Sequence, residues 1–460
     1  MDLSLSSKSV VNDGIHMRAA AVEFASIFDA KSFHQDAMQP ATEMMVMDRP
    51  SSPEPHILLA TTGQLASTAR LAMELREAGA RVCLIAPANH PARTLNFNTE
   101  KAIYRAVSPQ LCLEAAMRRF RPDMVIPCDE RTVRDLHALM RVTSDKYLKA
   151  LIEKSTAPAS SHATITSRAA LLSMAQRQGV RVPASMPLRN MDDLNRWIAG
   201  NDAPFVLKAD GSWAGFGVRI ISDASVAKDA FLRMTKRASG RLAVRESLLE
   251  GNYFGIRSWA RRERPAMSVQ GYVDGWPANI GVACWQGEVL AAVCAESVAT
   301  TSATGPSTVA RIIHNSEMID AAKRVVRALN LSGMIGFDFM IEAATGAAYL
   351  IEMNPRNTPI CALRLGPGRD LAEALVARLA GRQARERPAR TQRDVVVFFP
   401  DTWQEDPASH FLHSGFHDVP WEQPELVRVL MRPERRERYA VLRLLRKVWL
   451  ALNERESDRR

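Results

Sequence analysis

Residues 336–356 read GFDFMIEAATGAAYLIEMNPR, two strand-like runs joined by a turn. The turn, residues 344–346, is three residues long and ends in glycine, which predicts a β-hairpin whose last turn residue is left-handed. That register sets Asp338 opposite Glu352. Because side chains alternate along a strand, Glu352 and Asn354 share a face. Three oxygen donors from two neighbouring strands therefore converge.

These donors favour a metal ion. Two carboxylates and an amide oxygen amid apolar strands repel one another unless a cation lies between them, and hard oxygen ligands favour Mg²⁺ or Mn²⁺. Arg356, two residues beyond Asn354, can offer its guanidinium to an anionic substrate or transition state. Solvated residues at a strand end are the ordinary explanation of an isolated Asp–Glu pair. The shared face makes a metal site the better interpretation.

A second stretch, residues 204–221, reads PFVLKADGSWAGFGVRII and predicts a strand, a glycine-containing loop and another strand. Gly211, Gly215 and Gly217 permit close backbone approach, so the loop amides can bind a polyphosphate, and Lys208 adds a compact charge. The stretch contains neither the G-K-[ST] of a P-loop nor the dinucleotide fingerprint. Taken alone, it is equally well explained as an ordinary hairpin loop.

The composition places these stretches in a globular protein. The chain has 460 residues, 47% apolar and 24% charged, which is typical of two or three soluble domains and excludes a fibrous or wholly disordered chain. The formal net charge of +10 favours anionic partners. No compact pattern of aromatic and basic residues predicts a nucleic-acid platform, so no nucleic acid is expected.

The cysteines and the hydropathy indicate a cellular compartment. The six cysteines include no C-x-x-C pair, which argues against a zinc knot or a dithiol motif and favours reduced packing residues. No apolar run approaches the roughly 18 to 20 residues that a membrane-spanning helix needs, and the first twenty residues lack the pattern of a signal peptide. We therefore expect a cytoplasmic protein.

The N-terminal half divides at turn-rich stretches. Residues 1–53 show little periodicity and predict a loosely ordered extension. Residues 54–140 contain HILLATT, an apolar helical face, RVCLIAP and RPDMVIPCDE, which predict a small α/β domain with a parallel sheet. A connection rich in small residues and proline at 155–163 follows, and beyond it come many short strand-like runs, typical of an α+β domain with antiparallel sheet.

Residues 381–460 form a basic C-terminal region. Its last helix interleaves arginines with apolar residues, so it could lie on an anionic membrane surface. Packing of the apolar side against the protein is the more ordinary explanation, and membrane association is the less expected outcome.

In this order, the stretches resemble the ATP-grasp superfamily, in which ATP lies between two α+β lobes. The resemblance covers roughly residues 56–380 and also includes VIPCDE, GVRVP and VRESLLEGN. It implies an N-terminal Rossmann-like pre-ATP-grasp domain over 54–140 and a two-lobed ATP-grasp domain with antiparallel sheets over 141–380. The small lobe would span about 164–248 and the large lobe about 249–380.

The resemblance also implies roles for individual residues. Arg356 would face the phosphoryl group being transferred, and ATP and Mg²⁺ (or Mn²⁺) would be the cofactors. The metal ligands would be Asp338, Glu352 and Asn354. The phosphates would be held by Lys208 and covered by the loop that contains Gly211, Ser212, Gly215 and Gly217. The adenine would contact Glu246 and the hinge residues Ser247 and Leu249.

Two positions depart from the family pattern. Arg168 stands where a second phosphate-binding lysine is usual, which keeps the charge but changes its geometry. Tyr253 stands where an acidic residue commonly binds the ribose hydroxyls, and its phenol offers a weaker contact. Arg311 is a further candidate catalytic residue, which could turn toward the phosphate or the acceptor.

The resemblance implies an ATP-dependent ligase that converts ATP to ADP and phosphate. A small-molecule carboxylate would be activated as an acyl phosphate and then attacked by an amine or similar nucleophile. A bicarbonate-activating carboxylase or carbamoyl-phosphate-type enzyme is one alternative, and a catalytically silent ATP-binding sensor or scaffold is another. The fold does not name the substrates. Homo-oligomerisation remains open.

Overall fold

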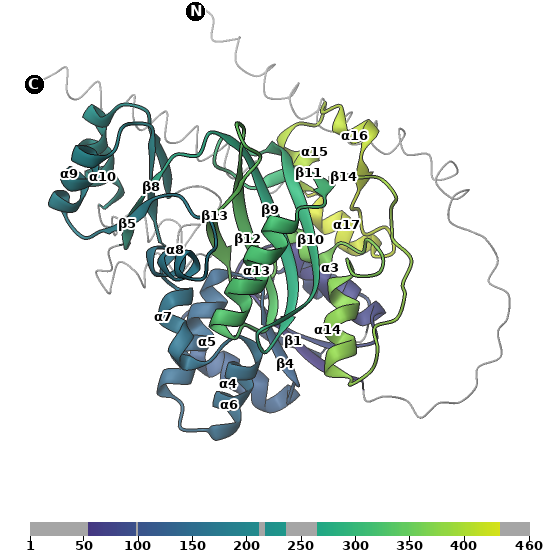
Figure 1. The fold of residues 1–460 in the computed structure, drawn as a ribbon. Coiled ribbons are helices and arrows are strands. Elements are labelled where there is room, and N and C mark those ends of the chain that lie inside the picture. Colours follow the sequence, from purple (N-terminus) through teal and green to yellow (C-terminus); the bar gives the residue numbers. More distant parts are fainter. Residues whose placement is uncertain (1–53, 98–99, 211–216, 236–264, 433–460) are drawn as a thin grey trace, which may run out of the picture. The chain divides into compact units, whose positions relative to one another are not determined.

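The structure is a computed structural model that describes residues 54–97, 100–210, 217–235 and 265–432 (Figure 1). The expected N-terminal extension, residues 1–53, and the arginine-rich end of the chain, residues 433–460, lie outside the described residues.

The first domain is a four-stranded parallel sheet with the strand order β3-β2-β1-β4. Alternate residues of β1 enter two different cores: Ile57 and Leu59 face α3, whereas Leu58 faces α4, α5 and α6. Burial on both faces explains the near-continuous apolar strand sequences. The parallel sheet expected within 54–140 is observed, and α6 extends the packing of this sheet beyond residue 140. Its strands are β1 (His56–Ala60), β2 (Arg81–Ala86), β3 (Glu100–Ile103) and β4 (Met124–Pro127), and its helices are α3 (Ala66–Glu77), α4 (Pro109–Phe120), α5 (Glu130–Val142) and α6 (Lys146–Ser155).

A smaller antiparallel sheet follows, with the strand order β5-β8-β6-β7. Its strands are β5 (Ser185–Leu188), β6 (Phe205–Ala209), β7 (Val218–Ile221) and β8 (Met267–Gly271), and α9 (Met191–Gly200) and α10 (Ala227–Met234) pack in its core. The preceding helices, α7 (His162–Ile165) and α8 (Arg168–Arg177), contribute to the core of the next sheet. Because β8 pairs with β5 and β6, the small sheet extends to Gly271. The expected lobe boundary at 248/249 is therefore wrong: the chain passes to the next sheet at 271–275.

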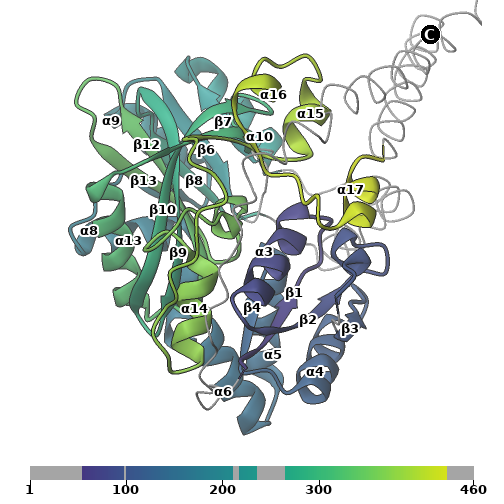
Figure 2. The same ribbon diagram turned by 90° about the vertical axis from the view of Figure 1, so that its right-hand side faces the viewer.

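The third sheet has seven strands in the order β13-β12-β9-β10-β11-β14-β15. All neighbouring pairs are antiparallel except β14 with β15. Helix α13 (Ser316–Leu329) packs on one face, and α14 (Leu371–Leu379) packs on the other, beside α3 of the first domain (Figure 2). The strands are β9 (Gly275–Trp285), β10 (Glu288–Thr300), β11 (Ser307–Ile313), β12 (Gly333–Glu342), β13 (Ala348–Asn354), β14 (Val395–Val397) and β15 (Phe416–His417).

Residues 381–432 complete this sheet instead of forming a separate basic region. They supply β14 and β15 together with the short helices α15 (Asp401–Glu405), α16 (Phe411–Ser414) and α17 (Pro424–Leu430). Arg390 Nε donates to the buried Glu74 carboxylate of α3 at 2.6 Å, and Arg387 Nε donates to Asp370 at 2.8 Å. Acidic partners inside the fold thus neutralise part of the local positive charge.

All six cysteines are free, and five of them are buried, as expected of packing residues. Among the described residues, no helix is both long enough and apolar enough to span a bilayer.

Candidate active site

The hairpin of β12 and β13 pairs Asp338 directly with Glu352, which confirms the predicted register at the site. The predicted loop length is wrong by one residue. The amide of Glu342 donates to the Ala347 carbonyl at 2.9 Å, which leaves four residues in the loop, and Gly346 is left-handed with φ 72°. The pairing then shifts by one between Phe339–Leu350 and Asp338–Glu352, so that Ile351 forms a β-bulge. The bulge cancels the longer loop and restores the register.

Asn354 joins the two carboxylates. Its Nδ2 donates to Asp338 Oδ2 at 2.9 Å, and its side chain is buried. Burial, reinforced by the charge of Glu352, raises the pKa of Asp338 to about 6. Burial also acts to raise the pKa of Glu352, but the positive charges of Arg168 and Lys208 outweigh it, and the pKa of Glu352 is lowered. The trio predicted from the hairpin is therefore one electrostatically coupled cluster.

Two cations approach this cluster from other elements. Arg168 begins α8, and its guanidinium donates to Glu352 Oε1 at 2.5 Å and to Asp210 Oδ1 at 3.2 Å. Lys208 on β6 is buried, and this burial, together with the charge of Arg168, lowers its pKa to about 8. Arg168 and Lys208 thus lie close to the paired carboxylates.

The small sheet has one apolar and one polar face, which explains the position of Lys208. Phe205, Leu207 and Val269 pack into a core with α9 and α10. Lys208 pairs with Ser268 and Val206 pairs with Gln270, so Lys208 and Gln270 lie on the opposite face. Gln270 is buried, and its Nε2 has no hydrogen-bond partner among the described residues.

Arg356 is held by a residue that the sequence did not single out. Its Nε donates to Glu130 Oε1 at 2.7 Å, and its Nη2 donates to Asn354 Oδ1 at 3.1 Å. Glu130 is the first residue of α5, whose N-cap is Asp129. The VIPCDE segment marked the end of a strand, but only the tertiary structure brings its last carboxylate to Arg356. The first domain therefore contributes directly to the site.

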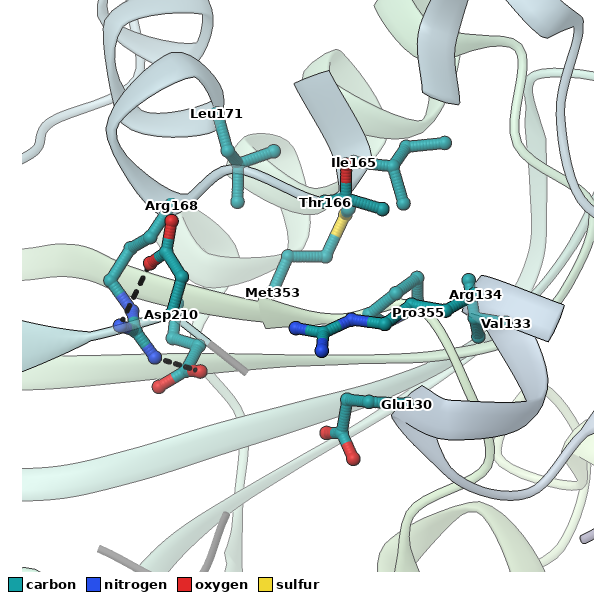
Figure 3. A pocket seen from close by; sticks show the side chains of 11 residues that line it. Glu130, Val133, Arg134, Ile165, Thr166, Arg168, Leu171, Asp210, Met353 and Pro355 are labelled. Atoms are coloured by element: carbon teal, nitrogen blue, oxygen red, sulfur yellow. Dashed lines mark hydrogen bonds and ion pairs between the residues drawn. The ribbon is translucent and has the colours of Figure 1, made fainter. Parts of the chain in front are cut away.

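A pocket opens beside these groups (Figure 3). Arg134 of α5 extends its guanidinium into the middle of the pocket, toward the region between Glu130 and Asp210. The lining residues are Glu130, Val133, Arg134, Ile165, Thr166, Arg168, Leu171, Asp210, Glu352, Met353 and Pro355. The pocket therefore combines apolar walls with charged groups of both signs, as small-molecule sites do.

Asn279 on β9 was also missed. It pairs with Asp338 across β9 and β12, so its side chain lies on the same face, and its buried Oδ1 has no partner among the described residues. The only sequence signal was a polar residue within the apolar run NIGVACW, which cannot reveal a cross-strand neighbour.

The remaining expected residues have different outcomes. Arg311 is half-exposed on β11, and its Nε lies 3.9 Å from Asp394 Oδ2. Because β9 and β10 lie between β11 and β12, the structure does not bring Arg311 to the metal trio. Gly217 is described, and its carbonyl accepts from the Ala209 amide at 2.8 Å. The expected residues that lie outside the described part of the chain are Gly211, Ser212, Gly215, Glu246, Ser247, Leu249 and Tyr253.

Residues 250–359 match the model of a family described as an ATP-grasp domain. Carboxyaminoimidazole ribonucleotide synthase from Aspergillus clavatus, complexed with ATP, is similar in structure with a TM-score of 0.54 and 13% identity, covering 73% of this chain and 80% of that one. Biotin carboxylase from Campylobacter jejuni has a TM-score of 0.51 and 14% identity, with coverages of 73% and 72%. An ADP complex of N5-carboxyaminoimidazole ribonucleotide synthetase has a TM-score of 0.52 and 16% identity, and the match covers 76% of this chain and 82% of that one. At these identities the likeness concerns the fold. No curated protein sequence matches the chain significantly.

Proposed function

Because residues 250–359 match the model of an ATP-grasp domain, we propose that the chain is an ATP-dependent ligase that activates a carboxylate as an acyl phosphate for attack by an amine or similar nucleophile. The observation that carries the proposal is the convergence of Asp338 and Glu352 with two cations from separate elements. Lys208 comes from the small sheet, and Arg356 follows β13. Phosphoryl transfer depends mainly on such positioning and charge stabilisation.

The donor set suits a hard divalent cation. Asp338 and Glu352 supply the carboxylates and Asn354 supplies an amide, and these are oxygen ligands that hard cations prefer. Asn354 directs its Nδ2 at Asp338 and its Oδ1 at Arg356, so the amide would have to turn to offer oxygen to a cation there. When bound, Mg²⁺ would neutralise the phosphate oxygens of ATP.

The chemistry assigned to the chain's own residues has two steps. In the first, a carboxylate oxygen of the substrate attacks the γ-phosphorus, ADP leaves, and Lys208 and Arg168 balance the charge of the phosphates. In the second, the amine attacks the carbonyl carbon of the acyl phosphate, loses a proton and expels phosphate. Arg356, oriented by Glu130, would stabilise the negative charge that develops on the tetrahedral intermediate.

The segment at which the chain passes from the small antiparallel sheet to the seven-stranded sheet supports a revised site for the adenine of ATP. The chain crosses at 271–275, so we place the adenine beside this segment rather than beside Glu246. Gln270 ends the polar face that carries Lys208, and its free Nε2 can donate to a ring nitrogen. This leaves Glu246, Ser247 and Leu249 without an assigned contact to the nucleotide in the proposal.

The pocket beside Glu352 is the proposed place of the carboxylate substrate. Arg134 can bind a carboxylate in a bidentate manner, and in the described part of the chain it forms no ion pair within 4.0 Å. Val133, Ile165 and Leu171 offer apolar contacts to the rest of the molecule. A small organic acid fits this lining better than bicarbonate, which has no apolar part to bury.

A silent nucleotide sensor is the second candidate, because Arg168 already neutralises Glu352. The deciding experiment measures phosphate release by the purified chain with ATP, Mg²⁺ and a matrix of carboxylic acids and amines. Release that requires an acid and an amine supports the ligase, and release that requires bicarbonate favours carboxylation. Tight ATP binding without turnover in the whole matrix would replace the ligase by the sensor.

A further inference from the structure

A second cluster of metal-ligating side chains lies at the amino-terminal edge of the parallel sheet. It consists of His56 at the start of β1, Cys83 in β2 and Glu100 at the start of β3, and their ligand atoms all lie within 4.8 Å of one another. The candidate active site contacts this domain at the opposite edge, where Glu130 follows β4. Nothing in the proposed ligase chemistry uses the cluster.

The strand order produces this convergence. Cys83 pairs with Glu100 on one side and with Leu58 on the other, and His56 lies two residues before Leu58 on the same face of β1. His56 Nε2 lies 2.7 Å from Cys83 Sγ and 3.7 Å from Glu100 Oε2, and Cys83 Sγ lies 3.8 Å from Glu100 Oε2. One sulfur, one nitrogen and one oxygen ligand therefore surround a common point.

From these side chains, we propose that His56, Cys83 and Glu100 bind a zinc ion. Zinc takes thiolate, imidazole and carboxylate ligands at about 2.0–2.3 Å, which in a tetrahedron separates ligand atoms by about 3.3–3.6 Å. The two distances to Glu100 Oε2, 3.7 and 3.8 Å, are close to this range. The distance of 2.7 Å between His56 Nε2 and Cys83 Sγ is shorter, and a small rotation of the partly exposed His56 ring would lengthen it. Water would complete the tetrahedron.

The charges around the cluster fit a divalent cation. A thiolate and the Glu100 carboxylate together balance two positive charges, and His56 contributes a neutral nitrogen. Outside the triad, Arg81 binds Glu100 at 2.8 Å and Asp123 accepts from the His56 amide at 2.8 Å, so the surrounding charges also cancel. The 39% exposure of the Glu100 side chain leaves an entry path for the ion.

A Cys–His nucleophile is the competing interpretation, and the environment of Cys83 argues against it. Cys83 is fully buried, and burial, together with the charge of Glu100, raises its pKa to about 12. Reactive cysteines are accessible and have lowered pKa values. A buried thiol that faces an imidazole and a carboxylate is better placed to bind a metal ion than to attack a substrate.

The test uses the full chain, stripped of metal, and adds Zn²⁺ or Co²⁺ alone. We expect one tightly bound equivalent and a thiolate-to-cobalt charge-transfer band. His56→Gln and Cys83→Ser should each weaken Zn²⁺ binding at least about tenfold. Cys83→Ser should also abolish the cobalt charge-transfer band, whereas His56→Gln should shift it. Glu100→Gln, which alters an exposed side chain and should not affect folding, should weaken binding without removing the band. Cys294→Ser, at a buried cysteine of β10, is the matched control.

Two results would overturn the proposal. One is the absence of a thiolate band with the wild-type chain. The other is a loss of binding that is equal in Cys83→Ser and Cys294→Ser, which would indicate adventitious thiol binding. Asp338→Asn should leave Zn²⁺ binding unchanged whether or not the chain is a ligase, so this test is independent of the proposed function.

Discussion

Arg168 Nη2 lies 2.5 Å from Glu352 Oε1, so the first residue of α8 neutralises one of the two carboxylates proposed to bind Mg²⁺. The same guanidinium reaches Asp210 at the end of β6. One side chain thereby links a helix, the small sheet and the hairpin of the large sheet. Binding of a cation at Glu352 has to compete with this ion pair.

The first prediction concerns the phosphate-binding role proposed for Arg168. Arg168→Gln should raise the KM for MgATP about tenfold or more, because the loss of the positive charge proposed to balance the phosphates should outweigh the release of Glu352 from its ion pair. Arg168→Lys should restore part of the affinity, since it keeps the charge without the bidentate geometry. Steady-state ADP formation at varied ATP and Mg²⁺ measures both effects. An unchanged KM in Arg168→Gln would mean that Arg168 does not contact the nucleotide.

The second prediction concerns the paired carboxylates. Asp338→Asn should lower kcat for ADP formation at least about a hundredfold, because it removes a carboxylate proposed to bind the cation. Glu342→Gln is the matched control: it lies on the same strand, its carboxylate contacts Thr345 in the loop, and its activity should stay within about twofold. Unfolding by urea should show both variants folded. Full turnover by Asp338→Asn would remove the metal assignment.

The third prediction concerns the orientation of Arg356. Glu130→Gln weakens the contact that holds the guanidinium, so kcat should fall about tenfold while the KM for ATP changes little. Arg356→Ala should have the larger effect, because it removes the charge itself. If Glu130 acts only through Arg356, the double variant should be no slower than Arg356→Ala alone. Additive losses would show that Glu130 acts independently.

The fourth prediction concerns stability in acid. The rings of His137 on α5 and His162 on α7 stack with centroids 3.5 Å apart, and burial, reinforced by the charge of His162, lowers the pKa of His137 to about 3. The unfolded chain therefore binds this proton more tightly, so the free energy of unfolding is highest above pH 6.5 and falls as the pH drops toward 3.

His137→Phe should remove part of this acid sensitivity. Between pH 7 and pH 4 the wild type should lose more stability than the variant, by an amount on the order of a few kcal/mol. Urea unfolding at both pH values measures the difference. The exposed His413→Gln should behave as the wild type does. Equal acid sensitivity of His137→Phe and the wild type would show that His137 titrates normally in the folded chain.

The hairpin shows how far sequence reasoning reached. Local alternation and turn chemistry predicted the pairing of Asp338 with Glu352, although the loop is one residue longer than expected. The bulge at Ile351 corrects the register. Neither the four-residue loop nor the bulge was predicted, because no residue type in this segment marks a bulge. The two deviations cancel, so the predicted pairing of Asp338 with Glu352 is nevertheless correct.

The amino-acid sequence by itself determined the alternation of strands and helices, the trio on one hairpin and the place of Lys208 on its strand, because each of these depends on residues of a single strand, helix or hairpin. Only the tertiary structure decided that Glu130 orients Arg356, that Asn279 adjoins Asp338, that the sheets change at 271–275, and that His56, Cys83 and Glu100 meet. Each of these contacts joins different strands or helices. Their partners are selected by burial of the sheets against one another, which no local pattern encodes.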